Sequence, residues 1–227
     1  TGTGAAPIVA DLAHEQGILT VGVVTKPFKF EGANRMRQAE DGINALSGKV
    51  DSLIIIPNDR LKYVTDQKIT FANAFGIADD VLKQAVTSIS ELVGFSDKVI
   101  INLDFADVSA VMKDAGRAHM GVGVASGREK AEQAALAAVA SPLLETSING
   151  ATGVLVNVTG SSELTLDDVE TAASIVQEAA NPDANIIFGA TSSENFQDEM
   201  RVTVIATGFE MKPETNVFAP KASAAAA

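Results

Sequence analysis

Several short segments of this chain combine residue types that can bind a phosphate or cleave its ester. The chain opens with alternating threonines and glycines at residues 1–4, directly before a helix-like pattern that has Pro7 in its first turn. Glycine allows a backbone to approach a phosphate closely, and the free N–H groups at a helix start favour negative charge. Short Gly/Thr stretches are also ordinary helix caps, and no Lys-Ser/Thr pair follows here as in a P-loop. Residues 1–4 therefore give a weak signal for a phosphate-binding loop when taken alone.

An acidic segment at residues 102–108 gives a more specific signal. It places Asn102, Asp104 and Asp107 close together between an apolar strand-like run and a new helical pattern. Phosphoryl transfer needs mainly a positioned water and compensation of charge, which two carboxylates and an amide can supply. Asp107 also suits a helix N-cap. Asp104 is flanked by apolar residues and is harder to explain in that way.

Two further sets of residues could contact a base or a sugar. Glu31 and Arg35 are four residues apart at a helix start, so they share one face, where a surface ion pair is the simple explanation. Phe75 could stack on guanine, and the carboxylate of Asp79 or Asp80 could accept from the N–H groups of that base. Core packing for the phenylalanine, and a favourable charge at a helix start for the aspartates, are the alternatives.

The elements that must position these residues follow from hydrophobic spacing. Apolar residues at spacings of three and four predict helices over 5–16, 31–46 and 71–93, and continuous apolar runs predict strands over 18–25 and 52–56. Helices that alternate with buried strands are typical of half of a doubly wound parallel α/β domain. The long third helix is expected to lie centrally between two layers. Its predicted apolar stripe consists of Phe71, Phe75, Ala78, Leu82, Val86, Ile89 and Val93.

The pattern changes beyond a short apolar run at 99–101. It predicts an α+β domain in which a four-stranded sheet is covered by two helices on one face. The predicted helices cover 107–115, 128–140 and 165–179, and the predicted strands cover 118–125, 153–159, 185–190 and 200–207.

Composition and charge exclude several classes of function. Hydrophobic residues make up 46% of the 227 residues and charged residues 20%, as in an ordinary soluble protein. Lys+Arg total 17 against Asp+Glu 29, a net charge of -12, which disfavours nucleic acid and anionic lipid as partners. No apolar run approaches the roughly 20 residues of a membrane span, so no membrane insertion is expected. The absence of cysteine excludes disulfides and thiolate metal sites, and the cytosol is therefore the expected compartment.

Other conspicuous features are interpreted as structural. The glycines at 121–127 suggest a dinucleotide fingerprint, but they fall in a predicted strand and have the wrong spacing. His14 and His119 are far apart and have no neighbouring ligand residues. The Asp167–Asp168 pair is expected to cap or solvate a helix.

In combination, these segments resemble the FtsZ family, the tubulin-like GTPases of the bacterial division ring. The glycine-rich signature of that family ends in Thr-Gly-Thr-Gly followed by Ala-Ala-Pro, as residues 1–7 do here. Residues 102–107 read Asn-Leu-Asp-Phe-Ala-Asp and resemble the synergy loop of the family almost letter for letter. Tubulin shares the glycine-rich run but not the other segments. The further similar segments are 26–32, 51–59, 75–82, 123–127, 141–145 and 201–208.

This resemblance implies a site for GTP or GDP. Glu31 would contact the ribose, Arg35 would lie beside the nucleotide and Asp80 would hold the base. The residues implied to bind the nucleotide are Thr1, Gly2, Thr3, Gly4, Glu31, Arg35, Phe75 and Asp80, with Asp79 as a substitute for Asp80.

The resemblance also implies a composite catalytic site. The synergy loop inserts into the nucleotide pocket of the neighbouring subunit, so that copies assemble head to tail into filaments. Asp104 and Asp107 would polarise the attacking water and contact a cation, Mg²⁺ or K⁺, while Asn102 lines the site. Such filaments would form the division ring in the cytoplasm at mid-cell, attached to the membrane by a tether such as FtsA.

The resemblance divides the chain into a tubulin-like GTPase domain, represented by its rear part at 1–70, a central helix and connection at 71–101, the synergy loop and C-terminal domain at 102–210, and a disordered tail at 211–227. Both ends are expected to be cut, because the chain starts inside the glycine-rich run and lacks the tail peptide that docks FtsA. This chain alone is therefore expected to bind GTP weakly or not at all. The alternative to a GTPase is a non-catalytic module that caps a filament end.

Overall fold

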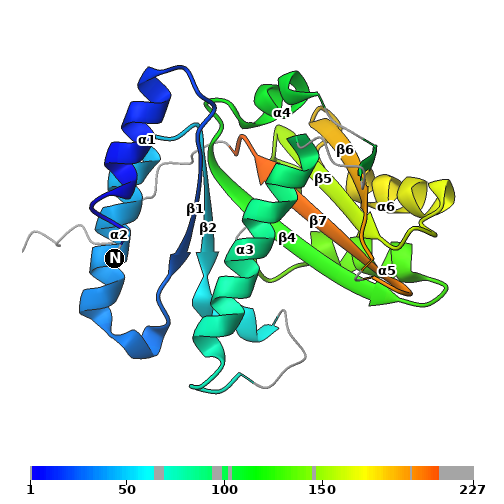
Figure 1. Cartoon of the computed structure of the whole chain (residues 1–227), viewed down its shortest axis with the longest axis horizontal. Coiled ribbons are helices and arrows are strands. Elements are labelled where there is room, and N and C mark those ends of the chain that lie inside the picture. Colours follow the sequence, from blue (N-terminus) through cyan, green and yellow to red (C-terminus); the bar gives the residue numbers. More distant parts are fainter. Residues whose placement is uncertain are drawn as a thin grey trace, which may run out of the picture.

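The computed structural model describes residues 2–63, 69–93, 99–101, 104–144, 147–194 and 196–209. The strands in these ranges form one seven-stranded sheet, and helices cover both of its faces (Figure 1). The α/β fold class predicted from the sequence is therefore confirmed. The predicted tail at 211–227 lies outside the described residues.

The first half of the sheet is parallel, as predicted. Its two strands, β1 and β2, pair along their whole length, and α1 and α2 cover one face. Leu53 and Ile55 of β2 pack against these helices, whereas Ile54 and Ile56 enter the core on the opposite face. The elements of this half are α1 (Ala6–Glu15), β1 (Val21–Lys26), the short 3-10 helix η1 (Lys29–Glu31), α2 (Ala33–Ser47), β2 (Ser52–Pro57) and the 3-10 helix η2 (Asn58–Tyr63).

The long helix α3 (Ala74–Val93) packs on that opposite face. The predicted apolar stripe was wrong in part, because Phe71, Phe75 and Val86 are 79%, 50% and 48% exposed. Small side chains face the sheet instead, which allows the helix to approach the bulky isoleucines and leucines of the strands closely. The residues of α3 that are buried are Ala74, Ala78, Ala85, Ser88 and Leu92.

The second half of the sheet contains the four predicted strands β4, β7, β5 and β6, and α5 and α6 cover one face. A further strand, β3, extends the edge by pairing antiparallel with β6. The whole sheet has the order β1-β2-β4-β7-β5-β6-β3. The elements of this half are β3 (Val99–Ile101), α4 (Phe105–Met112), β4 (Gly116–Ser126), α5 (Lys130–Val139), η3 (Ile148–Gly150), β5 (Gly153–Gly160), α6 (Leu166–Ala179), β6 (Asn185–Ser192) and β7 (Glu199–Thr207).

The strand β4 joins the two halves. Its first residues pair in parallel with β2, where Gly116 lies opposite Ser52, and from His119 onward it pairs antiparallel with β7. The predicted boundary near residue 101 therefore falls within one continuous sheet rather than between two sheets. The assignment of separate domains stays a prediction.

The features interpreted as structural have structural partners. A Cβ atom on Gly121 or Gly123 would run into the backbone of α5 at Ala138 or Ala134, so these glycines serve helix packing on β4. His119 is buried and its ring contacts Phe209 edge-on. The Thr165–Asp168 pair caps α6, since Asp168 accepts from the Thr165 N–H and hydroxyl while its own N–H donates to Thr165 Oγ1.

Polar contacts also fasten the far end of α3 to the second half of the sheet. Asn157 Nδ2 donates to Glu91 Oε2 over 3.4 Å. Burial lowers the pKa of the nearby Arg201, although Glu199 and Glu91 oppose this shift by their negative charge.

None of the helices in the described part of the chain is both long and apolar enough to cross a membrane.

Candidate functional site

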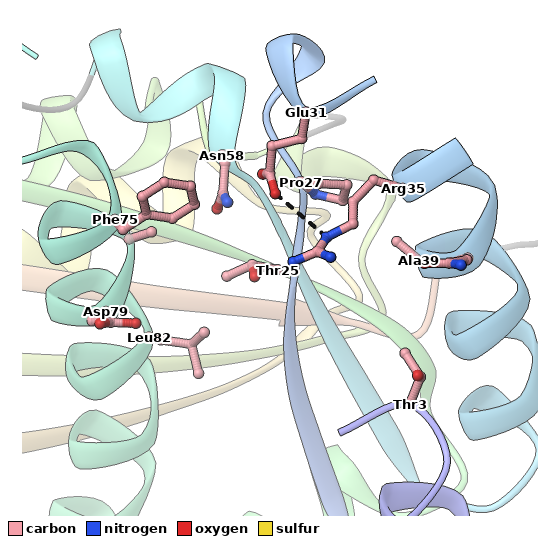
Figure 2. A pocket seen from close by; sticks show the side chains of 12 residues that line it. Thr3, Thr25, Pro27, Glu31, Arg35, Ala39, Asn58, Phe75, Asp79 and Leu82 are labelled. Atoms are coloured by element: carbon pink, nitrogen blue, oxygen red, sulfur yellow. Dashed lines mark ion pairs between the residues drawn. The ribbon is translucent and has the colours of Figure 1, made fainter. Parts of the chain in front are cut away.

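An open cleft of about 280 Å³ lies where β1 and β2 end and α3 begins (Figure 2). Residues from α2 and α3 face each other across the carboxyl end of β1. This edge is where parallel α/β sheets commonly bind ligands. The residues that line the cleft are Thr3, Thr25, Pro27, Glu31, Arg35, Gln38, Ala39, Asn58, Phe75, Ala78, Asp79 and Leu82.

One wall of the cleft carries Glu31 and Arg35. Glu31 Oε1 accepts from the Phe28 N–H at 2.9 Å, which fixes its side chain at the end of η1. Arg35 Nε lies 3.5 Å from Glu31 Oε2, so the predicted pair is formed. Gly32 has a φ of 93°, a value that glycine adopts without strain, and it turns the chain from η1 into α2. Arg35 is 64% exposed, so its charge is available to a ligand.

The facing wall is the start of α3. Phe75 is half exposed and contacts the ring of Phe28 edge-on, with 5.7 Å between centroids, so core packing does not account for it. Asp79 lies one helical turn beyond Phe75 and lines the cleft with it, as Figure 2 shows. Asp80, the residue preferred from the resemblance, is not among the cleft-lining residues because the next position along a helix points about 100° away.

The floor of the cleft contains an acceptor that sequence reasoning missed. Asn58 follows the carboxyl end of β2 and is 5% exposed, and its Oδ1 atom has no hydrogen-bond partner among the described residues. A buried acceptor without a partner costs free energy unless a ligand or water donates to it. The position directly after a buried parallel strand was the available sequence signal.

The glycine-threonine segment enters the cleft through Thr3. Gly2 and Gly4 are exposed and do not line the cleft, and Thr1 lies outside the described residues. A second missed residue, Gly42 in the middle of α2, makes room for this segment, since a Cβ there would lie 2.6 Å from Thr3 Cγ2. The phosphate-binding role of residues 1–4 stays a prediction.

The acidic segment forms the start of α4. Asp104 is the N-cap, because its Oδ1 accepts from the Ala106 N–H at 3.2 Å, and Asp107 lies in the first turn. The alternative explanation of Asp107 as the N-cap is therefore wrong, and the helix begins earlier than predicted. Both carboxylates are exposed. Asn102 lies outside the described residues.

The cleft and the acidic segment lie at opposite ends of the parallel strands. Asn58, at the end of β2, lines the cleft, whereas Asp51, just before β2, lines a hollow with Phe105 at the start of α4. The six residues of β2 between them span about 20 Å. Figure 1 shows α4 near the upper end of α3, whose lower end borders the cleft. We call the cleft-lining residues the cleft pole and residues 104–114 the acidic pole.

Asp104 and Asp107 offer only part of a cation site. Among the described residues there is no group of three or more His, Cys, Asp or Glu side chains that could hold a metal ion. Mg²⁺ is commonly bound by one or two carboxylates together with substrate phosphates and waters. Two exposed carboxylates fit that mode, in which phosphate oxygens complete the shell.

Known families and structures are similar to most of this chain. Residues 1–66 match the GTPase domain of the Tubulin/FtsZ family, and residues 116–210 match the C-terminal domain of the FtsZ family. An empty FtsZ dimer from M. jannaschii is 41% identical over 92% of this chain, with a TM-score of 0.86. The chain spans 60% of the length of that protein.

More distant structures share the fold alone. CetZ1 from Haloferax volcanii, a GDP-bound monomer, is 16% identical over 94% of this chain and 62% of its own, with a TM-score of 0.68. CetZ2 from the same organism, a GTPγS-bound protofilament, is 16% identical over 93% of this chain and 63% of its own, with a TM-score of 0.69.

Proposed function

The chain belongs to the FtsZ family, and on that premise we propose that the protein binds GTP at the cleft pole and associates head to tail with itself. Hydrolysis would then take place at the junction between two copies, where the acidic pole of one copy meets the nucleotide held by the other. The observation that carries this proposal is the separation of the two poles. Because about 20 Å of strand lies between them, one copy cannot bring both to the same phosphate.

The cleft pole has groups suited to a nucleoside. Phe75 offers a half-exposed aromatic ring for a base, and Asp79 offers a carboxylate one turn away that can accept from guanine N–H groups. The buried Asn58 Oδ1 can accept a further hydrogen bond, and Glu31 can accept from ribose hydroxyls. Asp80, the residue favoured by the resemblance, is the competing candidate for the base.

The acidic pole has groups suited to hydrolysis. We assign Asp104 and Asp107 to the polarisation of a water that attacks the terminal phosphorus of GTP, which releases phosphate and leaves GDP. Asn102 would line the same site. A bound Mg²⁺ supplies neutralisation of the charge that develops on the phosphate oxygens. The exposure of both carboxylates leaves them free to enter a neighbouring cleft.

The cellular setting follows from the family and is part of the proposal. Filaments of this protein would form the division ring in the cytoplasm at mid-cell, with a tether such as FtsA as the membrane partner. A fluorescent fusion that gives a mid-cell band would support this setting, and a uniformly diffuse signal in dividing cells would contradict it.

A second function is favoured by the charges of the cleft. Among the described lining residues the only cation is Arg35, which is already paired with Glu31, and Asp79 adds another negative charge. Such a lining gives little compensation for a triphosphate. The chain by itself would therefore act as a filament cap that offers its acidic pole to a neighbour without holding GTP.

The test is turnover in a mixture. M. jannaschii FtsZ with alanine at both aspartates of its own synergy loop would hold GTP, and this chain would be titrated into it. We expect GTP hydrolysis to be restored, because Asp104 and Asp107 would complete the site in trans. No restoration, with this chain shown to be folded and to co-sediment with the filaments, would leave only the capping function. Absence of binding as well would reject both.

A further inference from the structure

We propose that Asp51 and Ser52, at the start of β2, are positioning residues that aim Asp104 and Asp107 at the neighbouring nucleotide. This inference rests on the proposed function, since it concerns how the acidic pole is held. Neither residue touches the acidic carboxylates. They would act through the opposite end of α4.

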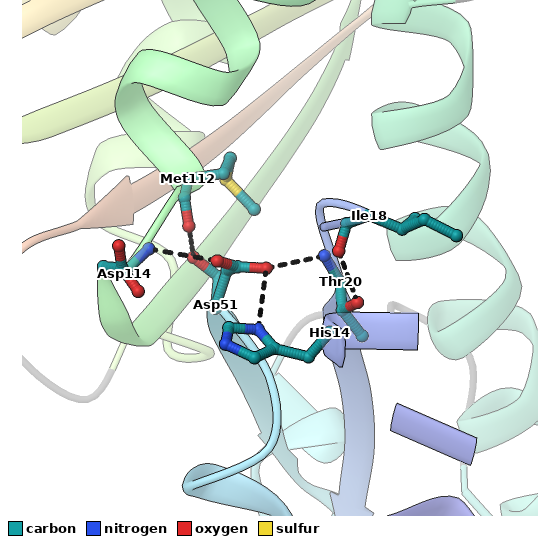
Figure 3. A network of polar contacts seen from close by, with 7 residues as sticks. His14, Ile18, Thr20, Asp51, Met112 and Asp114 are labelled. Atoms are coloured by element: carbon teal, nitrogen blue, oxygen red, sulfur yellow. Dashed lines mark hydrogen bonds and ion pairs between the residues drawn. The ribbon is translucent and has the colours of Figure 1, made fainter. Parts of the chain in front are cut away.

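The carboxylate of Asp51 ties three chain segments together (Figure 3). It is 4% exposed, and its Oδ2 accepts from the Thr20 N–H at 2.7 Å while its Oδ1 accepts from the Asp114 N–H at 3.4 Å. His14 Nδ1 lies 4.0 Å from Oδ2. The backbone of Asp51 joins the same segments, because its N–H donates to Thr20 O and its carbonyl accepts from Gly116. The segment before β1, the start of β2 and the turn after α4 thus share one anchor.

The next residue holds the end of α4 itself. Ser52 Oγ donates to the carbonyl of Met112, the last residue of the helix, at 2.6 Å, and this bond is buried. Asp51 then binds the turn that follows, at Asp114, whose φ of 52° is in the left-handed region. Asp tolerates that region better than most residues do. Ser52, the first residue of β2, and Asp51 directly before it therefore fix both sides of the point where α4 ends.

The other end of α4 depends on this anchor. Val108, Val111 and Met112 pack into the core, but residues 104–107 are all exposed. A helix of eight residues is about 12 Å long. A tilt of about 5° at the anchored end therefore moves the free end by about 1 Å, and misplacement by about 1 Å can reduce a catalysed rate by about 100-fold. A small change in direction at the anchored end of α4 is therefore enough to displace the carboxylates at its other end.

A purely structural role for Asp51 is the competing explanation. It predicts loss of folded protein, which lowers the effective concentration of the chain in the mixture. The positioning role predicts a lower turnover at saturation, with the concentration for half-maximal stimulation unchanged. The two explanations are therefore separated by a full titration.

The experiment uses three variants of the full chain in the mixture with the synergy-loop-deficient M. jannaschii FtsZ. In Asp51→Asn one carbonyl oxygen remains, but the amide nitrogen cannot accept from a backbone N–H. Asp11→Asn is the matched control, because it makes the same chemical change at a half-exposed carboxylate whose partner within the described part of the chain is Lys49. Asp104→Asn tests whether GTP turnover in the mixture depends on the acidic pole at all. Residual dipolar couplings of the α4 and α5 amides measure the direction of each helix.

We expect Asp51→Asn to lower the saturating turnover about tenfold, because a tilt of α4 misplaces the carboxylates. The loss is smaller than the 100-fold above, since Ser52 still holds the end of the helix. The α4 couplings should change, those of α5 should not, and Asp11→Asn should behave as the unmodified chain. If Asp104→Asn lowers turnover while Asp51→Asn matches Asp11→Asn, the inference is overturned and the proposed function stands. A loss that merely follows the unfolded fraction overturns it also. If Asp104→Asn has no effect, the proposed function fails and the inference fails with it.

Discussion

The cleft pole collects residues from segments that lie far apart in the chain, whereas the acidic pole is a single stretch from Asp104 to Asp114. Tertiary packing brings the segments of the first set together, although Glu31 with Arg35 and Phe75 with Asp79 are local pairs. The second set is placed by local helix capping and by one anchor on β2. We therefore expect the cleft pole to tolerate a change at any single residue better than the acidic pole does, because its ligand contacts are shared among several segments.

The largest expected effect comes from removing one charge at the acidic pole. Asparagine caps helices as well as aspartate does, so Asp104→Asn keeps the Ala106 contact and loses only the charge. We expect turnover in the mixture to fall about 100-fold, as for loss of a preorganised electrostatic group, while the melting temperature is unchanged. Asp104→Ala should show the same fall in turnover and, in addition, lose about 1 kcal/mol of stability with the cap. Full activity of Asp104→Asn would remove its carboxylate from the proposed mechanism.

A smaller effect is expected at the cleft pole. Asp79→Ala should weaken binding of guanosine monophosphate, measured by NMR titration of this chain, by about tenfold or more, the typical loss for a charged hydrogen bond. Asp80→Ala is the matched control, adjacent in sequence and outside the cleft lining. The reverse pattern, loss at Asp80 and none at Asp79, would move the base contact to Asp80.

A substitution at Gly42 tests the packing of α2 against the glycine-threonine segment at residues 1–4. Alanine at position 42 is better for a helix by about 1 kcal/mol, but its Cβ would meet Thr3 at 2.6 Å. We therefore expect Gly42→Ala to keep or raise stability while it weakens guanosine monophosphate binding about threefold, as one ordinary hydrogen bond would. Gly48→Ala has open space around it and should leave binding unchanged. Unchanged binding in Gly42→Ala would show that the position of Thr3 does not matter for the ligand.

The smallest expected effect is on stability at the Glu31–Arg35 pair. The Arg35 side chain is 64% exposed, and surface ion pairs contribute about 0–1 kcal/mol, so Arg35→Met should lower the unfolding free energy by no more than about 1 kcal/mol. It should nevertheless weaken binding of guanosine monophosphate and leave guanosine unaffected, because only the phosphate needs the cation. Lys49→Met breaks the pair with Asp11. It should change the unfolding free energy as little, and it should leave the binding of both ligands unchanged. Equal loss for both ligands would place Arg35 at the sugar or base.

Sequence patterns predicted the acidic pole more completely than the cleft pole. Asp104 and Asp107 lie close together in the sequence at the start of one helix, so a local motif specifies them. The alternative that made Asp107 the N-cap was wrong, because Asp104 caps the helix. In the cleft, four of the residues that the resemblance assigned to the nucleotide line the cavity, namely Thr3, Glu31, Arg35 and Phe75. Their contact with a nucleotide stays a prediction.

The remaining cleft residues show where local reasoning ends. The spacing of four from Phe75 already favours Asp79 over Asp80, because a helix places i and i+4 on one face. Asn58 and Gly42 were missed because each lies beside segments that are far away in the chain. Asn58 shares the cleft with residues of α2 and α3, and Gly42 lies against Thr3. The apolar stripe predicted for α3 was wrong in part, at Phe71, Phe75 and Val86, for a similar reason. Phe75 lines the cleft and Phe71 lines a separate hollow, and the helix turns its small residues to the sheet.

The shared strand β4 has a consequence for the order in which the molecule folds. Each of its neighbours in the sheet is distant in sequence, since Gly116 lies beside Ser52 and His119 beside Ala206. Closing such long loops costs entropy before any pairing compensates for it, so contacts of this kind form late and slowly. The arrival of one strand then completes both halves in the same event. Refolding should therefore show a single slow phase in which fluorescence probes placed in β2 and in β7 report the same rate.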